Sequence, residues 1–528
     1  MSENQIFNEK RWWSRLPIWR TLSDLQKYRA LEMIPGFLVW STFILAILLS
    51  FIKPLWVIYF IIIFDLFWLV RVIYILAYLV MAFVRFQNAK KKDWLKICLL
   101  PDYRSNYSEL YHLVILPTYK EDINILRTSF DCLAKTNYPK DKFIIVLACE
   151  ENDYERASNN AKIIQKEYGN VFNEIIITFH PANIPDELPG KGSNTAWAGK
   201  KAKERIDKLH ISYEKVIVSS LDIDSCVHPQ YFAYLTHTFL TTENPLRKSY
   251  QPIPLFNNNI WEAPAFTRVV ANATTFWLLS ETIRPDRLFT FSSHSMSFKT
   301  LVDVDFWQKD IVTEDSRIFL QGLIQYDGDY SVKPMYIPIS MDTVQGNNFW
   351  ETIKNVYKQQ RRWAYGVENF PYMVWNFAAN RLIPVSRKIK LVWNQLEGVY
   401  SWATAPILIF ALGHLPLWVA NWEGSEIKEL AFVQNAPYTL QILMTSAMIG
   451  LLLSAILSTI ILPPKPKNNS YLKYPLMVIQ WALFPIAMIV FGSIPATDAQ
   501  TRLLFGKYLG FDVTAKVRNI IKNQSRNQ

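Results

Sequence analysis

Long apolar runs at both ends of the chain constrain its fold more than any other sequence feature. Residues 34–52 form one run, which is about long enough to cross a bilayer as a helix. A Lys53-Pro54 break precedes a second run at 55–84, which we interpret as a span near 55–72 that continues as a helix along the inner membrane surface. Three further runs follow a long polar stretch, at residues 398–420, 438–462 and 474–494. The sequence therefore predicts membrane helices on both sides of a soluble domain.

The distribution of charge predicts which side of the membrane each loop occupies. Basic residues flank both outer ends of the first hairpin, and the loop after residue 462 and the tail are also basic, so all of these are expected to be cytoplasmic. Three spans after a cytoplasmic domain would leave the tail outside. We therefore expect residues 474–494, interrupted at Pro485, to be re-entrant or interfacial. Asp65 and Arg71 lie in the second apolar run, where a charged residue often has a function. The alternative is structural: the Arg71 side chain would reach to the membrane edge, and Asp65 would face a neighbouring helix.

Composition excludes several classes of protein. Charged residues make up 19% of the 528 residues and aromatic residues 15%, so a disordered chain is excluded. The net charge of +11 is spread along the chain, which favours an anionic membrane face or anionic substrate over nucleic acid. The four cysteines form no CxxC pair, which indicates reduced thiols rather than a zinc site or disulfide framework: Cys98, Cys132, Cys149 and Cys226.

Residues 101–388 lose the membrane character and alternate short β-rich runs with helical ones. This alternation predicts a Rossmann-like α/β domain with a parallel sheet, whose ligands lie at the carboxyl ends of the strands. The expected strands are residues 112–117, 143–148, 174–179 and 215–224.

Acidic residues end the last of these strands. Asp222 and Asp224 end this strand, so we expect their side chains to point to the same side, because strand side chains alternate. Two carboxylates this close together fit Mg²⁺ or Mn²⁺ held together with substrate phosphates. The alternative is a strand-end turn that carries two solvated acids.

Two helical segments carry further candidates. Thr313 caps a helix whose first turn holds Glu314 and Asp315, so Asp315 is either a general base at a rigid helix start or an acid that suits the helix dipole. Gln359, Arg362 and Trp363 share one helical face. The Arg362 guanidinium could bind a diphosphate and the Trp363 ring could stack on a sugar. The alternative is a basic amphipathic helix that lies on the membrane surface.

The remaining candidates are weaker alone. Tyr119 and Glu121 follow the first strand and suit a nucleobase and a ribose, although for this segment alone a loop with a surface tyrosine is the favoured interpretation. Lys191 opens a helical segment and is placed to meet phosphate, or belongs to a plain turn. His294 fits a hydrogen-bonded structural histidine better than a catalyst.

Taken together and in this order, these motifs resemble membrane-integrated family 2 glycosyltransferases of the cellulose synthase and hyaluronan synthase type. The resemblance rests on the segment 117–121, the DxD at 222–224, the TED at 313–315 and the QxxRW at 359–363. The segment 511–516 adds an FxVTxK pattern like the gating loop of cellulose synthases.

The resemblance implies a role for each position, with a GT-A domain inserted between the membrane helices. Asp315 would be the catalytic base, and a Mg²⁺ or Mn²⁺ ion would bind Asp222 and Asp224. The other implied sets are donor-binding Thr118, Tyr119, Glu121, Glu150, Lys191, Asp222 and Arg362; acceptor-binding Glu314, His294, Gln359 and Trp363; and gating Phe511, Val513, Thr514 and Lys516.

The predicted protein is an integral-membrane inverting glycosyltransferase that uses a nucleotide-sugar, expected to be UDP-linked, at the cytoplasmic face of a plasma or inner membrane. Its acceptor is a saccharide, in the manner of a processive polysaccharide synthase, or a lipid, in the manner of ceramide glucosyltransferase-like enzymes. A third alternative is a non-catalytic membrane transporter or scaffold. The predicted division is a basic N-terminus at 1–33, a transmembrane hairpin at 34–84, the catalytic domain at 101–388, membrane and interfacial helices at 389–495, and a cytoplasmic tail at 496–528.

Overall fold

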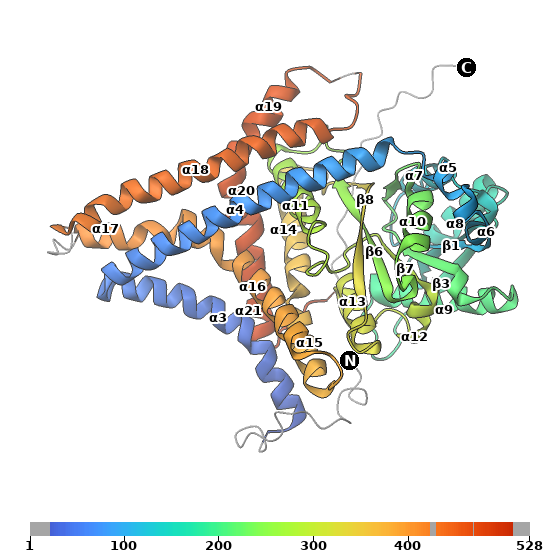
Figure 1. Ribbon diagram of the computed structural model, residues 1–528, viewed down its shortest axis with the longest axis horizontal. Helices are drawn as coiled ribbons and strands as arrows, with labels where there is room; N and C mark the ends of the chain where they lie inside the picture. Colours follow the sequence, from blue (N-terminus) through green and yellow to red (C-terminus); the bar gives the residue numbers. More distant parts are fainter. Residues whose placement is uncertain (1–21, 423–428, 468, 511–528) are drawn as a thin grey trace.

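A computed structural model describes residues 22–422, 429–467 and 469–510 of the chain. Apolar helices from both ends of the sequence gather on one side of the molecule, and an α/β domain lies on the other (Figure 1). The predicted fold class, an α/β domain inserted between N- and C-terminal apolar helices, is confirmed.

The α/β domain is built on one mixed sheet of eight strands in the order β3-β2-β1-β4-β7-β6-β8-β5. The first four strands in this order are parallel, as predicted, whereas β7 runs antiparallel to both β4 and β6. The strands are β1 (Tyr111–Pro117), β2 (Phe143–Glu150), β3 (Glu174–His180), β4 (Val216–Ser220), β5 (Cys226–Val227), β6 (Lys248–Phe256), β7 (His294–Ser297) and β8 (Ser331–Met341).

Helices cover both faces of the sheet because its central strands are apolar on both sides. Along β1, Leu113 and Ile115 enter one core, whereas Val114 and Leu116 enter the other. The helix α7 (Ile123–Ala134) and helix α10 (Tyr231–Thr241) cover the second face, and helix α9 (Lys191–Lys208) covers the first. This packing fixes the carboxyl ends of β1, β2 and β4 at one edge, where the candidate residues lie.

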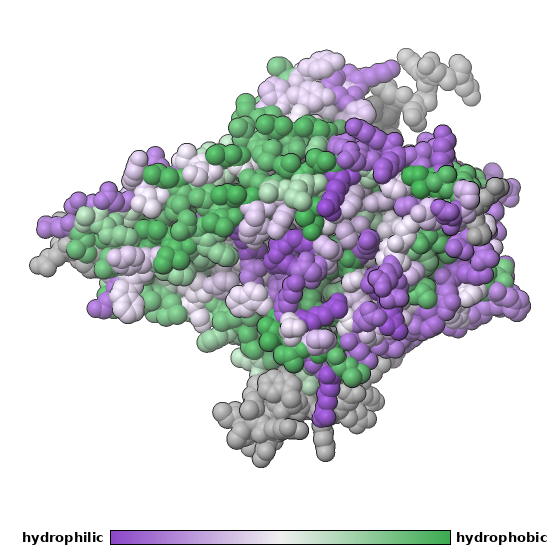
Figure 2. Space-filling model, viewed as in Figure 1, coloured by the Kyte–Doolittle hydropathy of each residue, from purple (hydrophilic) through white to green (hydrophobic). Residues whose placement is uncertain are grey.

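Within the residues that the structure describes, four helices are long and apolar enough to cross a membrane. They are α3 (Asp24–Ile52), α4 (Pro54–Lys91), α18 (Ala431–Ile461) and the helical run Lys473–Leu504. A fifth candidate is the pair Val385–Phe410 and Leu412–Asn421, which is bent by 49°. The apolar surface in Figure 2 extends over this side of the molecule, while the α/β side is mostly hydrophilic.

The first hairpin differs in its bounds from the prediction. Helix α3 begins at Asp24 rather than near residue 34, because Ser23 and Gln26 form a capping box. Helix α4 continues unbroken to Lys91, as predicted, and its second half packs on the α/β domain through Leu79 and Phe86.

The last helical run separates the two sides of the molecule. Between Lys473 and Leu504 it comprises α19 (Lys473–Ile479), α20 (Phe484–Met488) and α21 (Ile494–Leu504), joined by a 3₁₀ turn and a π turn. Figure 1 shows this run crossing between the apolar helices and the α/β domain, and Asp498 of α21 bonds Arg361 of the domain at 3.1 Å. A re-entrant or interfacial run stays a prediction, and this placement is compatible with it.

Candidate active site

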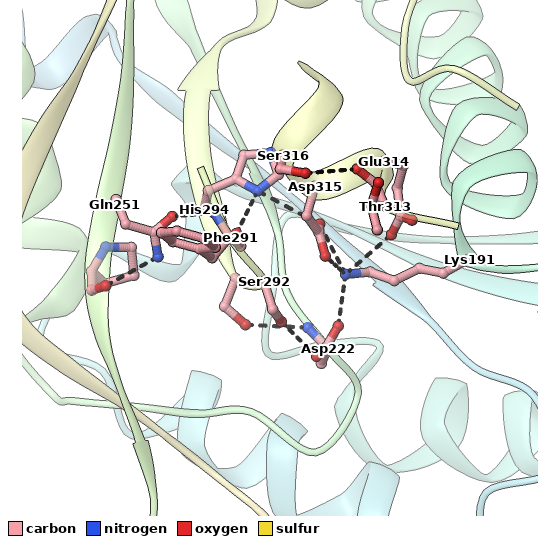
Figure 3. A network of polar contacts seen from close by, with 12 residues as sticks. Lys191, Asp222, Gln251, Phe291, Ser292, His294, Thr313, Glu314, Asp315 and Ser316 are labelled. Atoms are coloured by element: carbon pink, nitrogen blue, oxygen red, sulfur yellow. Dashed lines mark hydrogen bonds and ion pairs between the residues drawn. The ribbon is translucent and has the colours of Figure 1, made fainter. Parts of the chain in front are cut away.

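The ammonium group of Lys191 holds together the candidates from three separate elements. Its Nζ lies 2.8 Å from Oδ1 of Asp222, 2.7 Å from Oδ2 of Asp315 and 3.6 Å from Oε1 of Glu314 (Figure 3). Lys191 is the first residue of α9, Asp222 follows β4, and the two other acids open helix α13 (Glu314–Gln325). Four residues that the sequence assigned to the donor (Lys191 and Asp222), the acceptor (Glu314) and catalysis (Asp315) therefore form one cluster.

A close approach of two helix starts makes this cluster possible. A Cβ on Gly192 would lie 3.0 Å from the carbonyl oxygen of Gln308 and 3.2 Å from Cβ of Glu314. Glycine at this position therefore lets the first turn of α9 pack directly on the first turn of α13.

Burial and neighbouring charges shift the pKa values of Lys191 and Glu314 in this cluster. Burial alone would lower the pKa of Lys191, but Asp222, Asp315 and Glu314 raise it well above its usual value, so the ammonium stays charged. Burial, with the neighbouring carboxylate of Asp315, raises the pKa of Glu314 to about 8. Glu314 is therefore largely neutral at neutral pH, and Lys191 is the counter-ion of Asp222 and Asp315.

The two aspartates of the DxD motif do not share one environment. The chain turns after β4, where Ser225 N donates to the carbonyl oxygen of Asp222, so strand alternation ends before the motif. The Asp222 side chain is 24% exposed and accepts from Ser292 Oγ at 2.5 Å. Asp224 is 1% exposed and accepts from the backbone amide of Asp342 at 2.9 Å. Asp222 is thus the accessible carboxylate, and Asp224 is anchored beneath it.

His294 lies at the edge of the cluster on β7. Its Nδ1 is 3.0 Å from the carbonyl oxygen of Phe291 and 3.7 Å from Oδ1 of Asp315. Burial lowers its pKa, so the imidazole is neutral and its Nδ1–H donates to Phe291. This arrangement fits a side chain that supports the loop 291–294 beside Asp315.

The loop predicted to bind the nucleobase follows β1, and the carboxylate of Glu121 within this loop stabilises its conformation. The Glu121 carboxylate accepts hydrogen bonds from Thr118 Oγ1 at 2.9 Å and from the amide of Tyr119. Lys120 has a φ of 65°, and its amide donates to Asp153 at 2.9 Å. The Thr118 amide bonds the carbonyl oxygen of Ala148 on β2. The loop is therefore tied to the end of the neighbouring strand.

A histidine that the sequence did not single out joins the ends of β2 and β3. Nδ1 of His180 is 3.0 Å from Glu150 and its Nε2 is 2.9 Å from Glu187, which also pairs with Lys309 at 2.6 Å. Glu150, predicted to bind the donor, therefore has its carboxylate turned toward His180. The signal was present in the sequence, since both residues end apolar runs that pair in register in the sheet.

We expect this histidine to make stability depend on pH. Burial lowers the pKa of His180, but hydrogen bonds to Glu150 and Glu187 outweigh it and raise the pKa above its ordinary value. Its stabilising contribution is therefore complete below about pH 6.5 and is lost as the pH rises through the folded-state pKa. His180→Gln should cost on the order of 3 kcal/mol at pH 6 and clearly less at pH 9, measured as the fall in Tm in each buffer. An equal loss at both pH values would show that the histidine acts only as a neutral hydrogen-bond donor.

The QxxRW residues lie on helix α14 (Phe349–Ala364) and line a pocket beside the site. Gln359 and Trp363 contribute to this pocket together with Phe256 of β6, whose ring lies 5.6 Å from that of Trp363. The Arg362 guanidinium is close enough to Glu314 to lower its pKa. The gating-loop residues lie outside the described residues: Phe511, Val513, Thr514 and Lys516.

The residues fit a divalent cation only in part. Among the described residues, no group of three or more His, Cys, Asp or Glu side chains is arranged to hold a metal ion. Mg²⁺ and Mn²⁺ do, however, commonly bind through one or two carboxylates together with substrate phosphates. The accessible oxygens of Asp222, next to Asp224, suit that mode of binding.

Comparison with known proteins gives matches only among solved structures. No protein-family model matches the chain, and no curated protein matches it. A Pyrobaculum calidifontis mannosyltransferase in complex with GDP-mannose and Mn²⁺ is 13% identical, with a TM-score of 0.43 over 82% of this chain and 100% of that chain. Residues 1–349 of S. aureus TarS in complex with UDP-GlcNAc are 12% identical, with a TM-score of 0.35 over 76% and 94% of the two chains. At these scores, the argument for function rests on the geometry of the site.

Proposed function

We propose that the protein is an integral-membrane glycosyltransferase that moves a sugar from a nucleotide-sugar, with inversion, to an acceptor hydroxyl. The observation that carries this proposal is the Asp222–Lys191–Asp315 cluster at the carboxyl ends of the parallel strands. In this cluster Lys191 supplies a cation that can bind phosphate, Asp222 supplies an accessible carboxylate that can bind a metal ion, and Asp315 supplies a carboxylate at the start of a helix. A transporter or scaffold has no use for this combination.

The donor would bind along the edge formed by β1, β2 and β4. Tyr119 and Glu121 would hold the nucleoside, with Glu150 at the end of the adjacent strand, and Lys191 with Arg362 would face the diphosphate. Asp222 and Asp224 would hold a Mg²⁺ or Mn²⁺ ion, which neutralises charge on the leaving diphosphate. Arg362 adds a guanidinium fork for the same charge.

Asp315 would take the proton from the acceptor hydroxyl. Its position in the first turn of α13 favours the ionised carboxylate through the helix dipole, and packing on α9 fixes its geometry. Attack from the side of Asp315, opposite the leaving diphosphate, inverts the anomeric centre. Gln359 and Trp363 would border the acceptor, while Glu314 and His294 support the helix start and the loop beside it.

The apolar helices would embed the enzyme in a plasma or inner membrane with the α/β domain on the cytoplasmic side. The basic segments that flank the hairpin support this orientation. The acceptor would be a growing saccharide, as in a processive polysaccharide synthase, or a lipid; the charge cluster described in the next section favours the lipid.

The test uses the full chain in lipid nanodiscs with a panel of nucleotide-sugars and follows release of the nucleoside diphosphate. We expect release from one donor, dependent on Mg²⁺ or Mn²⁺ and abolished by a chelator. Asp222→Asn should lower the rate by about 10²–10³-fold, because it removes electrostatic stabilisation of the leaving group. Asp207→Asn, an exposed aspartate at the end of α9, is the matched control and should leave the rate unchanged. Absence of release from every donor, with lipid extracts supplied as acceptors, would contradict the proposed function.

A further inference from the structure

Five charged side chains cluster where the membrane helices meet the α/β domain. Arg71 of α4 bonds Glu397 of helix α16 (Val385–Phe410), and Arg287 shares that carboxylate at 3.3 Å. Arg284 pairs with Glu281 at 3.6 Å, near the end of helix α11 (Ala265–Glu281). Arg71 therefore binds a partner across the helices rather than reaching alone to the membrane edge.

The cluster carries an excess of positive charge. Three guanidinium groups face two carboxylates, so the cluster has one more positive than negative charge when all five groups are ionised. The Nε–H groups of Arg71 and Arg287 are buried and have no hydrogen-bond acceptor among the residues that the structure describes. All five side chains keep between 13% and 19% of their surface exposed. The cluster is thus open to a small anion that arginine forks recognise, such as a phosphate group.

The surroundings of the cluster are those of a lipid rather than of a soluble anion. On α4, the side chains next to Arg71 are exposed and apolar, with Val70 at 56% and Ile73 at 60%. On α16, one turn before Glu397, Trp393 is 67% exposed. If the anionic group of a lipid binds at this cluster, the apolar chains of that lipid would lie in the seam between α4 and α16.

The depth of the cluster agrees with the level of lipid phosphates. Seventeen residues separate Pro54, where α4 begins, from Arg71, which corresponds to ~26 Å along a helix at 1.5 Å per residue. The hydrocarbon core of a bilayer is about 30 Å thick. If α4 starts at the outer boundary, as proposed above, Arg71 lies close to the inner one.

The cluster also connects directly to the active site. Trp277 of α11, one turn before Glu281, has its ring 5.5 Å from that of Phe291. The next residue, Ser292, donates to Asp222. Five residues separate Arg287 from Ser292, and an extended chain of that length spans at most about 18 Å. Arg287 therefore lies within about 18 Å of the loop that contacts Asp222, so the charge cluster and the active site belong to the same part of the domain.

We propose that Arg71, Arg284 and Arg287 form the head-group site for a phosphate-bearing lipid acceptor. This rests on the proposed function, since it names the acceptor class of the same site. The phosphate accepts hydrogen bonds from the guanidinium groups, and the apolar chains lie in the seam between α4 and α16.

The test measures lipid binding apart from transfer. The full chain is purified in detergent with phosphatidylcholine, and retention of dioleoyl phosphatidic acid is followed by native mass spectrometry without donor or metal. We expect one phosphatidic acid per chain, not displaced by excess phosphatidylcholine or inorganic phosphate. The double substitution R284Q/R287Q should weaken its binding by at least about tenfold. Arg247→Gln, an exposed arginine paired with Asp329, is the matched control and should bind as the unchanged protein does.

Three results would overturn the proposal: equal retention by the double variant, equal retention of phosphatidylcholine, and displacement by inorganic phosphate, which would identify a free anion as the ligand. If the double variant does not fold, Arg284→Gln alone preserves the contacts of Arg71 and Arg287 and should still weaken binding. Arginine-dependent lipid binding without diphosphate release from any donor would instead count against the proposed function and leave the lipid site standing.

Discussion

Replacing Asp315 with asparagine is expected to lower the rate of sugar transfer by about 10²–10⁴-fold, because general-base catalysis contributes on this order. Asparagine keeps the shape of the side chain and its position in the first turn of α13, but it cannot accept the proton of the acceptor hydroxyl. In the Asp315→Asn variant Lys191 still pairs with Asp222, so the residues proposed to bind the diphosphate keep their charges. Affinity for the nucleoside diphosphate should therefore change little. The measurement is the turnover rate with saturating donor, together with diphosphate binding by calorimetry.

The control for this variant lies beyond the other end of the same helix. Asp329 follows α13, is half exposed and pairs with Arg247, so Asp329→Asn makes the same chemical change outside the site. It should leave turnover unchanged. Turnover by Asp315→Asn close to that of the unchanged protein would remove Asp315 as the base. An equal loss in the Asp329 variant would attribute the effect to the fold.

The first half of the sheet was predictable from sequence because its strands are continuous apolar runs. The run predicted at 112–117 is β1 (Tyr111–Pro117), and that at 143–148 is the start of β2 (Phe143–Glu150). Such runs are buried on both faces, so their composition alone marks them. Strand β8 (Ser331–Met341) was missed because it holds two prolines, which are disfavoured in strands.

The contacts of the site were less accessible to sequence reasoning than its residues. The motifs assigned Lys191, Asp222 and Asp315 to the donor and catalytic parts of one site, but they did not show that Lys191 bridges the two carboxylates. Its partners lie 31 and 124 positions further along the chain, and only the packing of α9 on α13 brings them together. No local pattern encodes that distance.

The charge cluster at the membrane boundary shows the same limit. The sequence identified Arg71 as a candidate functional residue because charged residues are rare in apolar runs. Glu397 and Arg287 are ordinary charged residues in polar contexts and give no comparable signal. The structure brings them to Arg71 only because α4 continues past the expected span and packs on α11 and the sheet.

Replacing Lys191 with methionine is expected to destabilise the metal-free protein and to make its stability depend on divalent cations. The ammonium is the counter-ion of Asp222 and Asp315, and its loss leaves their carboxylates partly buried and facing one another. Removing one partner of a buried ion pair costs on the order of 3 kcal/mol, which lowers Tm by about 3 °C in a chain of 528 residues, because the entropy of unfolding grows with chain length.

Mg²⁺ or Mn²⁺ should restore much of that Tm, because a cation that binds only the folded state stabilises it and Asp222 offers accessible oxygens beside Asp224. The unchanged protein should respond less, since Lys191 already neutralises the site. Lys200→Met on the same helix, where Lys200 pairs with the exposed Asp305, is the matched control and should show neither the loss nor the rescue. A Lys191 variant that keeps its Tm, or that gains no more from Mg²⁺ or Mn²⁺ than the unchanged protein, would show that the carboxylates do not form a cation site. Rescue by either ion would show that these carboxylates hold a divalent cation in the folded protein, as the proposed function requires.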